Sequence, residues 1–350
     1  MGIIRFLLAI SVLVAHTNSF DNLLFVGAQN SVQLFYIISG FLISYILNET
    51  KNYENSIIKF YFNRILRIYP IYIFVLILTV IYFYFLNSFN SLDNFKNFNL
   101  QTKVLVIFSN IIILTQDWLH FISVVDFSIE LNKNIKNPLS QWLIVGPAWT
   151  LGLELTFYII APFVVKNKLR IVFLIFISVF FRLFLIKEGL YKLQPWSYML
   201  FLSELHLFLF GTLSHLVLSK LYIKIFKKNY LFISKIFTYF FLIFIIFYPY
   251  IKIESGALKI AILFFLFLLI LPMLFFFQNN NFYDKLIGSL SYPIYICHEF
   301  IINILNFFFN LNQTTFIFLA IFCSITFSIF LNIFVQKRFE RIRIYNKIKS

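Results

Sequence analysis

The chain has 350 residues, of which 61% are hydrophobic, 21% aromatic and only 12% charged, with a formal net charge of +15. A soluble domain has about 25% charged residues because its surface faces water, so this composition excludes a soluble enzyme. The positive charge does not indicate a nucleic-acid binder either. Lys and Arg gather in short connectors between apolar runs, which is the pattern of a protein that crosses a membrane several times.

Apolar runs long enough for a membrane helix recur along the whole chain. A helix needs about 20 apolar residues to cross the hydrocarbon core of a bilayer. Only the run 103–117 is short for this purpose. In chain order, the candidate segments are 3–19, 31–48, 68–87, 103–117, 147–165, 169–187, 201–219, 229–250, 257–277, 289–309 and 314–335.

The cations predict which connectors face the cytoplasm, because Lys and Arg are enriched on that side. They gather in connectors 49–67, 166–170 and 220–228 and in the C-terminal tail. The first two connectors fall on the same side only if segment 103–117 does not cross. The sequence therefore predicts an all-α transmembrane bundle with about ten spans and both termini in the cytoplasm. The outer region 88–146 would then contain a re-entrant or interfacial helix.

One membrane domain accounts for residues 1–350. We find no internal repeat, metal-ligand cluster or Gly-rich phosphate loop in the sequence, and no appended soluble domain. The sequence thus predicts no bound metal.

Arg5 and His16 share one face of the first predicted helix. Their separation of eleven residues returns to within about 20° of the starting direction and spans about 16 Å along the axis. Arg5 then lies near the cytoplasmic mouth, and His16 points the same way from beyond the membrane centre. His16 could simply form a hydrogen bond within the bundle. Ionisable groups in membrane helices usually face a cavity, however, which favours a functional role.

Arg64 and Arg67 form an Arg-x-x-Arg pair on the cytoplasmic side. Side chains three residues apart share a helix face and could bind a phosphate through paired hydrogen bonds. Cations at the membrane edge also act as simple topology anchors. The sequence alone leaves both interpretations open.

Glu154 follows Trp149 near the start of a predicted span, and Tyr158 lies one turn further on. A carboxylate in the outer half of a bilayer is costly unless it is paired, protonated or solvated, so we expect it to face a polar cavity. His16 should lie at a similar depth. A His and a Glu approaching from two helices suit general-base chemistry, with the carboxylate orienting the ring or stabilising its cation.

A polar stripe follows one face of the helix expected at 289–309. Tyr292, Tyr295, Glu299, Asn303 and Asn306 recur at helical spacing, with His298 beside them. Hydrogen bonds between helices explain the Asn residues. We expect Tyr295 and His298 to line a cavity. For Glu204, His206 and His215 we expect packing at helix interfaces, and His120 in the outer region could be merely solvated.

Five stretches, in this order, resemble the membrane acyltransferase-3 family of bacterial O-acyltransferases. Arg5-x10-His16 is similar to the Arg…His signature of its first span. Residues 32–43 resemble its Leu-Phe-Phe-x-x-Ser-Gly-Phe-Leu block, and residues 64–70 its Arg-x-x-Arg-Ile-x-Pro element. Residues 149–158 resemble Trp-Ser-Leu-x-x-Glu-x-x-Phe-Tyr, and residues 291–298 resemble Ser-Tyr-x-x-Tyr-x-x-His.

The resemblance covers nearly the full chain, with weaker matches at Phe210-Gly211 and Phe339-Glu340-Arg341. Two positions depart from the family pattern, and in addition no Pro follows Glu340-Arg341. Gln33 stands where an acidic residue is common, and Thr150 replaces Ser. The first departure bears on any role that the family would give to an acid at that position.

The resemblance implies an enzyme of the bacterial cytoplasmic membrane that transfers an acyl group, usually acetyl from cytoplasmic acetyl-CoA. The acceptor would be a hydroxyl of a cell-envelope glycan or glycolipid, and no cofactor would be permanently bound. Arg64 and Arg67 match the donor motif, with help from Arg5. His16 matches the essential histidine, as base toward the acceptor or as transient acyl carrier, with Glu154 as second catalytic candidate. The expected substrate cavity comprises Ser39, Trp149, Tyr158, Tyr295 and His298.

The alternative is a transporter of glycans or lipids, or a glycan polymerase, of similar aromatic-rich membrane type. Such a protein would need a wide polar path or a large outer loop. The outer region 88–146 is modest, and a transporter would leave the ordered motifs unexplained.

Overall fold

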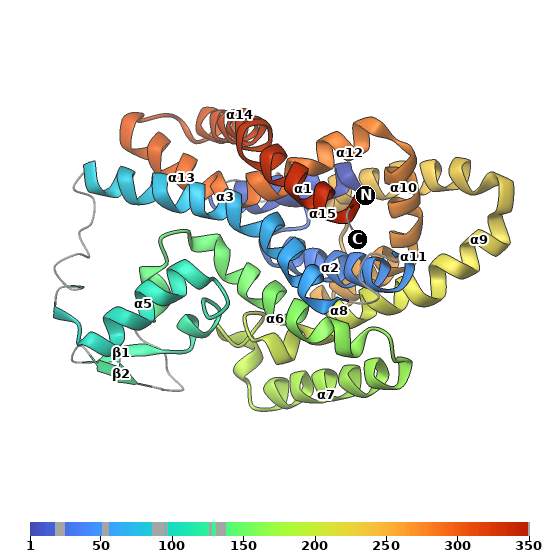
Figure 1. Ribbon diagram of the computed structural model, residues 1–350, viewed down its shortest axis with the longest axis horizontal. Helices are drawn as coiled ribbons and strands as arrows, with labels where there is room; N and C mark the ends of the chain where they lie inside the picture. The colour runs from blue at the N-terminus through green and yellow to red at the C-terminus, as the bar shows by residue number, and fades with distance from the viewer. Residues whose placement is uncertain are drawn as a thin grey trace.

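Helices make up nearly all of the described chain, as Figure 1 shows for the computed structural model. The structure describes residues 1–17, 25–50, 56–85, 95, 97–125, 128–130 and 138–348. The first half contains α1 (Gly2–Ala15), α2 (Ala28–Glu49), α3 (Ile57–Phe85), α5 (Leu100–Ile112), β1 (Ser123–Val125), β2 (Ser128–Glu130), α6 (Trp149–Val164) and α7 (Lys168–Lys187). The second half contains α8 (Phe201–Leu213), α9 (Lys220–Phe226), α10 (Tyr230–Phe247), α11 (Gly256–Asn280), α12 (Phe282–Ser289), α13 (Ser291–Phe308), α14 (Gln313–Phe330) and α15 (Lys337–Ile348).

The prediction of a mainly helical fold is confirmed, with one small exception. Strands β1 and β2 form an antiparallel hairpin in which Ser123 pairs with Glu130 and Val125 with Ser128. The hairpin lies beside α5 at one end of the molecule (Figure 1). Parts of the outer region 88–146 and of the connector 49–67 fall outside the described residues.

Seven helical stretches of the described chain are long and apolar enough to cross a membrane. One of them, Phe201–Tyr250, contains both α8 and α10, and Figure 1 shows α9 leading away from the bundle before α10 returns. The protein is therefore a multi-pass membrane protein. The stretches are Ala28–Glu49, Ile57–Phe85, Gly146–Val164, Lys168–Lys187, Phe201–Tyr250, Gly256–Asn280 and Gln313–Ile342.

The count of about ten spans and the cytoplasmic placement of both termini remain predictions. Helix α5 has 13 residues, which gives a length of about 20 Å against a hydrocarbon core of about 30 Å. It is therefore too short to cross on its own, in line with the prediction for segment 103–117.

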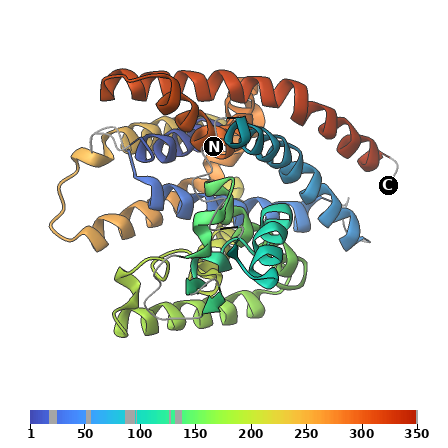
Figure 2. The same ribbon diagram turned by 90° about the vertical axis from the view of Figure 1, so that its left-hand side faces the viewer.

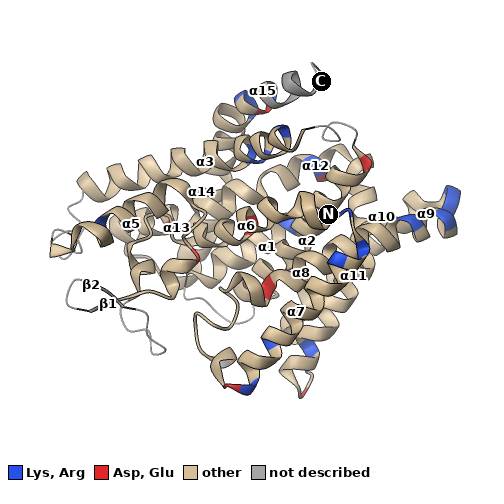
Figure 3. Ribbon diagram, turned by 60° about the horizontal axis from the view of Figure 1, so that its bottom comes forward, with Lys and Arg blue, Asp and Glu red and all other residues tan. Residues whose placement is uncertain are grey.

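The outer faces of the peripheral helices are apolar, as lipid contact requires. Helices α7 and α14–α15 lie at opposite edges of the bundle (Figures 1 and 2). Figure 3 shows long sections of α3, α13 and α14 without charged residues, while Lys and Arg gather around α9 and α15. On α7 the large exposed apolar side chains are Leu169, Val172, Phe173, Phe176, Phe180, Leu183, Phe184 and Ile186.

Helices α2 and α8 approach closely because each presents a glycine to the backbone of the other. A Cβ atom at Gly40 would overlap the carbonyl oxygen of Phe208, and one at Gly211 would overlap that of Ile37. Small residues allow membrane helices to approach in this way. This contact accounts for both glycines of the sequence motifs and fixes α2, which contributes side chains to the site described below.

A charged network joins α2, α7 and α8 inside the bundle. Arg182 Nη1 donates to Glu204 Oε1 at 2.6 Å, and Gln33 Nε2 donates to Glu204 Oε2 at 2.8 Å. The Glu204 side chain is fully buried, so its charge depends on these donors. An acid at position 33 would face the carboxylate of Glu204, which gives a physical reason for Gln33 in this chain.

Removing the cation should therefore destabilise the protein more than removing both charges. We expect Arg182→Met to lower the free energy of unfolding by about 3–5 kcal/mol, because an unpaired carboxylate would remain buried. The double variant Arg182→Met/Glu204→Gln should lose clearly less. Thermal unfolding in detergent measures both, and equal losses for the two variants would show that Glu204 does not depend on Arg182.

Candidate functional site

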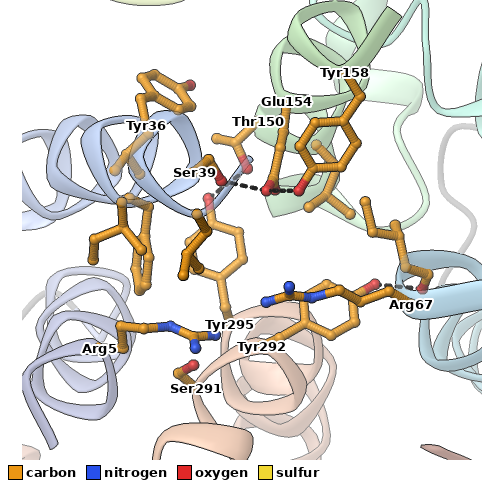
Figure 4. A pocket seen from close by; sticks show the side chains of 16 residues that line it. Arg5, Tyr36, Ser39, Arg67, Thr150, Glu154, Tyr158, Ser291, Tyr292 and Tyr295 are labelled. Atoms are coloured by element: carbon orange, nitrogen blue, oxygen red, sulfur yellow. Dashed lines mark hydrogen bonds between the residues drawn. The ribbon is translucent and has the colours of Figure 1, made fainter. Parts of the chain in front are cut away.

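Side chains from α1, α2, α3, α6 and α13 surround a cavity of about 80 Å³, shown in Figure 4. A volume of this size holds several water molecules or a slim chain, and nothing as wide as a nucleotide base. We call it the arginine cavity. It is lined by Arg5, Val32, Phe35, Tyr36, Ile38, Ser39, Leu42, Arg67, Ile68, Thr150, Leu151, Glu154, Tyr158, Ser291, Tyr292 and Tyr295.

Arg5 of α1 and Arg67 of α3 extend their guanidinium groups into this cavity from two sides (Figure 4). Among the described residues, no carboxylate oxygen lies within 4.0 Å of either group. Two cations in an enclosed cavity without such a partner favour the entry of an anion. The role of Arg5 and Arg67 toward an acyl donor remains a prediction.

Glu154 lies on the side of the same cavity opposite Arg5 (Figure 4). Its Oε1 accepts hydrogen bonds from the hydroxyls of Ser39 and Tyr158. From the sequence we expected this carboxylate next to His16, and that expectation is wrong. Glu154 comes from the first turns of α6, which carries it to α2 and the arginine cavity instead.

Arg64 does not line the arginine cavity, although it was expected to share a face with Arg67. Its side chain is buried, with the guanidinium carbon 5.7 Å from the ring centroid of Phe60 and 5.9 Å from that of Tyr158. Side chains at positions i and i+3 point about 60° apart around the helix axis. This offset directs Arg67 into the cavity and leaves Arg64 behind Tyr158. Of the two arginines in the Arg-x-x-Arg motif, Arg67 therefore lines the cavity and Arg64 packs against aromatic rings.

His16 lines a second cavity of about 210 Å³, which we call the histidine cavity. It lies at the C-terminal end of α1, where its Nδ1 donates to the carbonyl oxygen of Val12 at 2.8 Å. Its side chain is 40% exposed. The lining residues are Val12, His16, Ala28, Val32, His120, Ser140, Leu143, Gly146, Pro147, Trp149, Tyr198, Tyr295 and Glu299.

Glu299 occupies the position next to His16 that was predicted for Glu154. The His16 Nε2 and Glu299 Oε1 atoms are 3.5 Å apart. The backbone N–H of Gly146 donates to the Glu299 carboxylate, and a Cβ atom at position 146 would overlap Glu299 Oε2. From the sequence, Glu299 was one member of a polar stripe on this helix and had no assigned role. An ionisable residue in an apolar helix was the signal that could have found it.

His298 does not line either cavity, which corrects its expected role as a cavity residue. Its side chain is fully buried, and its ring centroid lies 4.9 Å from that of His16 in an edge-to-face arrangement. Its Nδ1 donates to the carbonyl oxygen of Tyr295 at 2.8 Å. His298 thus packs against the His16 ring on the side of the protein interior.

Tyr295 forms part of the wall between the two cavities, because it lines both of them together with Val32. Its hydroxyl lies 2.9 Å from the Thr150 hydroxyl. Thr150 is thus a hydroxyl partner at the position where the family pattern has Ser.

The comparison with protein families gives one match. The family model described as an acyltransferase domain matches residues 1–333. The chain belongs to the acyltransferase-3 family. No curated protein and no solved structure matches the chain. The alternative of a transporter or polymerase leaves this match without an explanation.

The region matched by the acyltransferase family model includes every residue that lines the two cavities. Each cavity is lined by a different set of family-motif residues. The motif residues Ser39, Arg67 and Glu154 face the arginine cavity, whereas His16 and Trp149 face the histidine cavity. The structure therefore brings nine of the ten predicted site residues into or against two adjoining cavities, with Arg64 displaced behind Tyr158.

A segment of this acyltransferase outside the spanning helices closes the histidine cavity. The His120 ring lies 5.4 Å from that of Trp149 and its Nε2 is buried, so His120 is packed against its neighbours and is not merely solvated. Burial lowers the pKa of His120 to about 4. Asp117, in the same segment, is buried near Gly152, and burial raises its pKa to about 7.

Asp117 should make the stability of this segment depend on pH. Its pKa in the folded protein, about 7, lies above the ordinary value of 3.8, so the folded state binds more protons between these values. Stability therefore falls as the pH rises from about 4 to about 7. Asp117→Asn should be more stable than the parent by about 2–4 kcal/mol at pH 8, with the difference gone near pH 4. Melting temperatures across this range measure the effect; a difference independent of pH would contradict it.

Proposed function

We propose that this membrane acyltransferase transfers an acyl group, most simply acetyl, from cytoplasmic acyl-CoA to a hydroxyl of a cell-envelope glycan. One observation supports the proposal above all others. A cavity with two arginines that no described carboxylate contacts adjoins a cavity with a histidine–carboxylate pair, and Tyr295 and Val32 line both. An anionic donor needs positive charge, whereas a neutral alcohol needs a base that accepts its proton. The arginine cavity provides the first and the histidine cavity provides the second.

The arginine cavity suits the donor. The phosphates of CoA are anionic, and guanidinium groups bind phosphate through paired hydrogen bonds. The cavity is too narrow for the nucleotide, which would remain at its mouth while the slim pantetheine arm enters. The thioester would reach His16 once Tyr295 turns aside. Acyl-CoA is thus a substrate in this proposal, and no permanently bound cofactor takes part.

His16 suits the role of general base. Its Nδ1 donates to Val12, so the neutral ring presents the lone pair of Nε2 toward the cavity and Glu299. The acceptor hydroxyl gives its proton to Nε2 while its oxygen attacks the thioester carbonyl. The carbon–sulfur bond then breaks, and the CoA sulfur takes the proton from His16. Glu299 stabilises the imidazolium that exists between these steps.

A polar hollow beside His16 supports a glycan acceptor. It has a volume of about 560 Å³ and extends from His16 and Thr17 to the end of α13. The amide side chains of Asn306 and Gln313 and several phenylalanines line it. Amides exchange hydrogen bonds with sugar hydroxyls, and aromatic rings cover their apolar faces. In this proposal the donor comes from the cytoplasm and the acceptor lies outside, which favours the bacterial cytoplasmic membrane as the location of the enzyme.

Replacing the base should stop the chemistry without unfolding the protein. We expect His16→Gln to lower kcat for acyl transfer by about 10²–10⁴-fold, because general-base catalysis contributes about this much. The melting temperature should stay close to that of the parent, since the side chain is 40% exposed. Labelled acetyl-CoA and envelope glycan in proteoliposomes provide the assay. A variant with full activity would refute the role of His16, and label retained on the parent protein after quenching would indicate an acyl carrier instead.

The two arginines of the motif should differ in their effect on donor binding. Arg67→Gln should raise the KM for acyl-CoA by about 10–100-fold, because a charge-assisted hydrogen bond contributes about 1.5–3 kcal/mol. Arg64→Gln is the matched control and should raise this KM far less, because Arg64 lies behind Tyr158. Steady-state rates at varied acyl-CoA concentration measure both. Equal effects would show that the cavity is not where the donor phosphates bind.

A further inference from the structure

Three side chains from α1 and α13 bring possible metal-ligand atoms close together. One ligand atom each of His16, His298 and Glu299 lies within 4.8 Å of the other two. The cluster borders the histidine cavity through His16 and Glu299, so a small solute can reach it.

Hydrogen bonds to the backbone decide which ring nitrogens face the cluster. A carbonyl oxygen can only accept, so Nδ1 of His16 donates to Val12 and Nδ1 of His298 donates to Tyr295, both at 2.8 Å. In the neutral rings, each Nε2 is then left with a lone pair. Among the described residues, no hydrogen-bond partner reaches the buried Nε2 of His298. With both rings neutral and Glu299 ionised, the cluster has three acceptors and no donor.

We propose that His16, His298 and Glu299 form a binding site for a divalent transition metal, with zinc the best match. Two imidazole nitrogens and one carboxylate are a common ligand set for zinc that keeps a fourth position open. Magnesium and calcium prefer oxygen ligands, so imidazoles select against them. The backbone carbonyls that fix both rings are also the usual outer partners of histidines that bind metal.

Only small movements are needed to complete this site. Tetrahedral ligands at about 2.0–2.1 Å from zinc lie about 3.4 Å from one another. His16 Nε2 and Glu299 Oε1 are already 3.5 Å apart. The partly exposed His16 and Glu299 side chains can turn toward the fixed His298. The open fourth position faces the histidine cavity.

Zinc at this site inhibits acyl transfer. This consequence rests on the proposed function, in which the lone pair of His16 Nε2 accepts the proton of the acceptor. A bound metal occupies that lone pair and removes the base. Zinc binding itself does not depend on this role, so the two inferences can fail separately.

The first experiment measures zinc binding without any acyl donor. The full chain is purified in detergent with a tag that contains no histidine, and it is titrated with zinc chloride against a colorimetric chelator. We expect one zinc per chain. His298→Gln and Glu299→Gln should each weaken binding by more than about 10-fold. His215→Gln is the matched control, because His215 contacts Ser44 in another part of the bundle and should leave the affinity unchanged.

Lack of saturable zinc binding by the folded parent protein would overturn the site. Equal losses in the His215 variant and the cluster variants would overturn it as well, because binding would then depend on global integrity. The second experiment adds zinc to the transfer assay, with each variant compared with its own zinc-free rate. Inhibition of the parent that weakens in Glu299→Gln supports the inhibitory role. Binding without inhibition would retain the site and refute the role of His16 as base.

Discussion

The structure depends on the contact between α1 and α13, which brings His16 to Glu299 in an otherwise apolar bundle. A charged group within a membrane protein must be paired or must face a cavity, because hydrocarbon cannot solvate it. Asp284 fixes the start of α1 by accepting hydrogen bonds from the N–H groups of Gly2 and Ile3 at 2.7 and 2.9 Å. At the other end, Gly146 lets the backbone reach Glu299. The position of the base therefore follows from packing at both ends of α1.

Ionisable groups inside this protein are either paired with a partner or face a cavity. Glu204 is fully buried and has Arg182 and Gln33 as donors, so it stabilises the bundle and remains hidden from substrate. Arg5 and Arg67 line a cavity and have no described carboxylate within 4.0 Å. An unpaired charge that faces a cavity stays available for a ligand, whereas a paired and sealed charge is structural. This distinction separates catalytic candidates from framework residues more reliably than residue type does.

The sequence predicted the helical membrane fold, the family and most of the site, because each depends on local pattern. Apolar length predicts membrane helices, and the spacing of Arg5 and His16 predicts their common face. The partners of the charged groups could not be read in this way. Glu154 and Glu299 are both acids in apolar helices, and nothing local shows which one meets His16. The sequence shows no metal motif because such motifs are made of residues close together in the chain. The proposed zinc ligands come instead from opposite ends of the chain.

Sequence alone determined that this chain crosses a membrane, that it is helical and which residue types its site contains. Tertiary structure decided that two cavities replace one, that Arg64 turns behind Tyr158, and that Glu299 pairs with His16. The physical reason is that hydropathy and helical period are properties of neighbouring residues. Pairing and cavity shape depend instead on how closely helices approach, as at Gly40, Gly146 and Gly211, where a single methyl group would separate the partners.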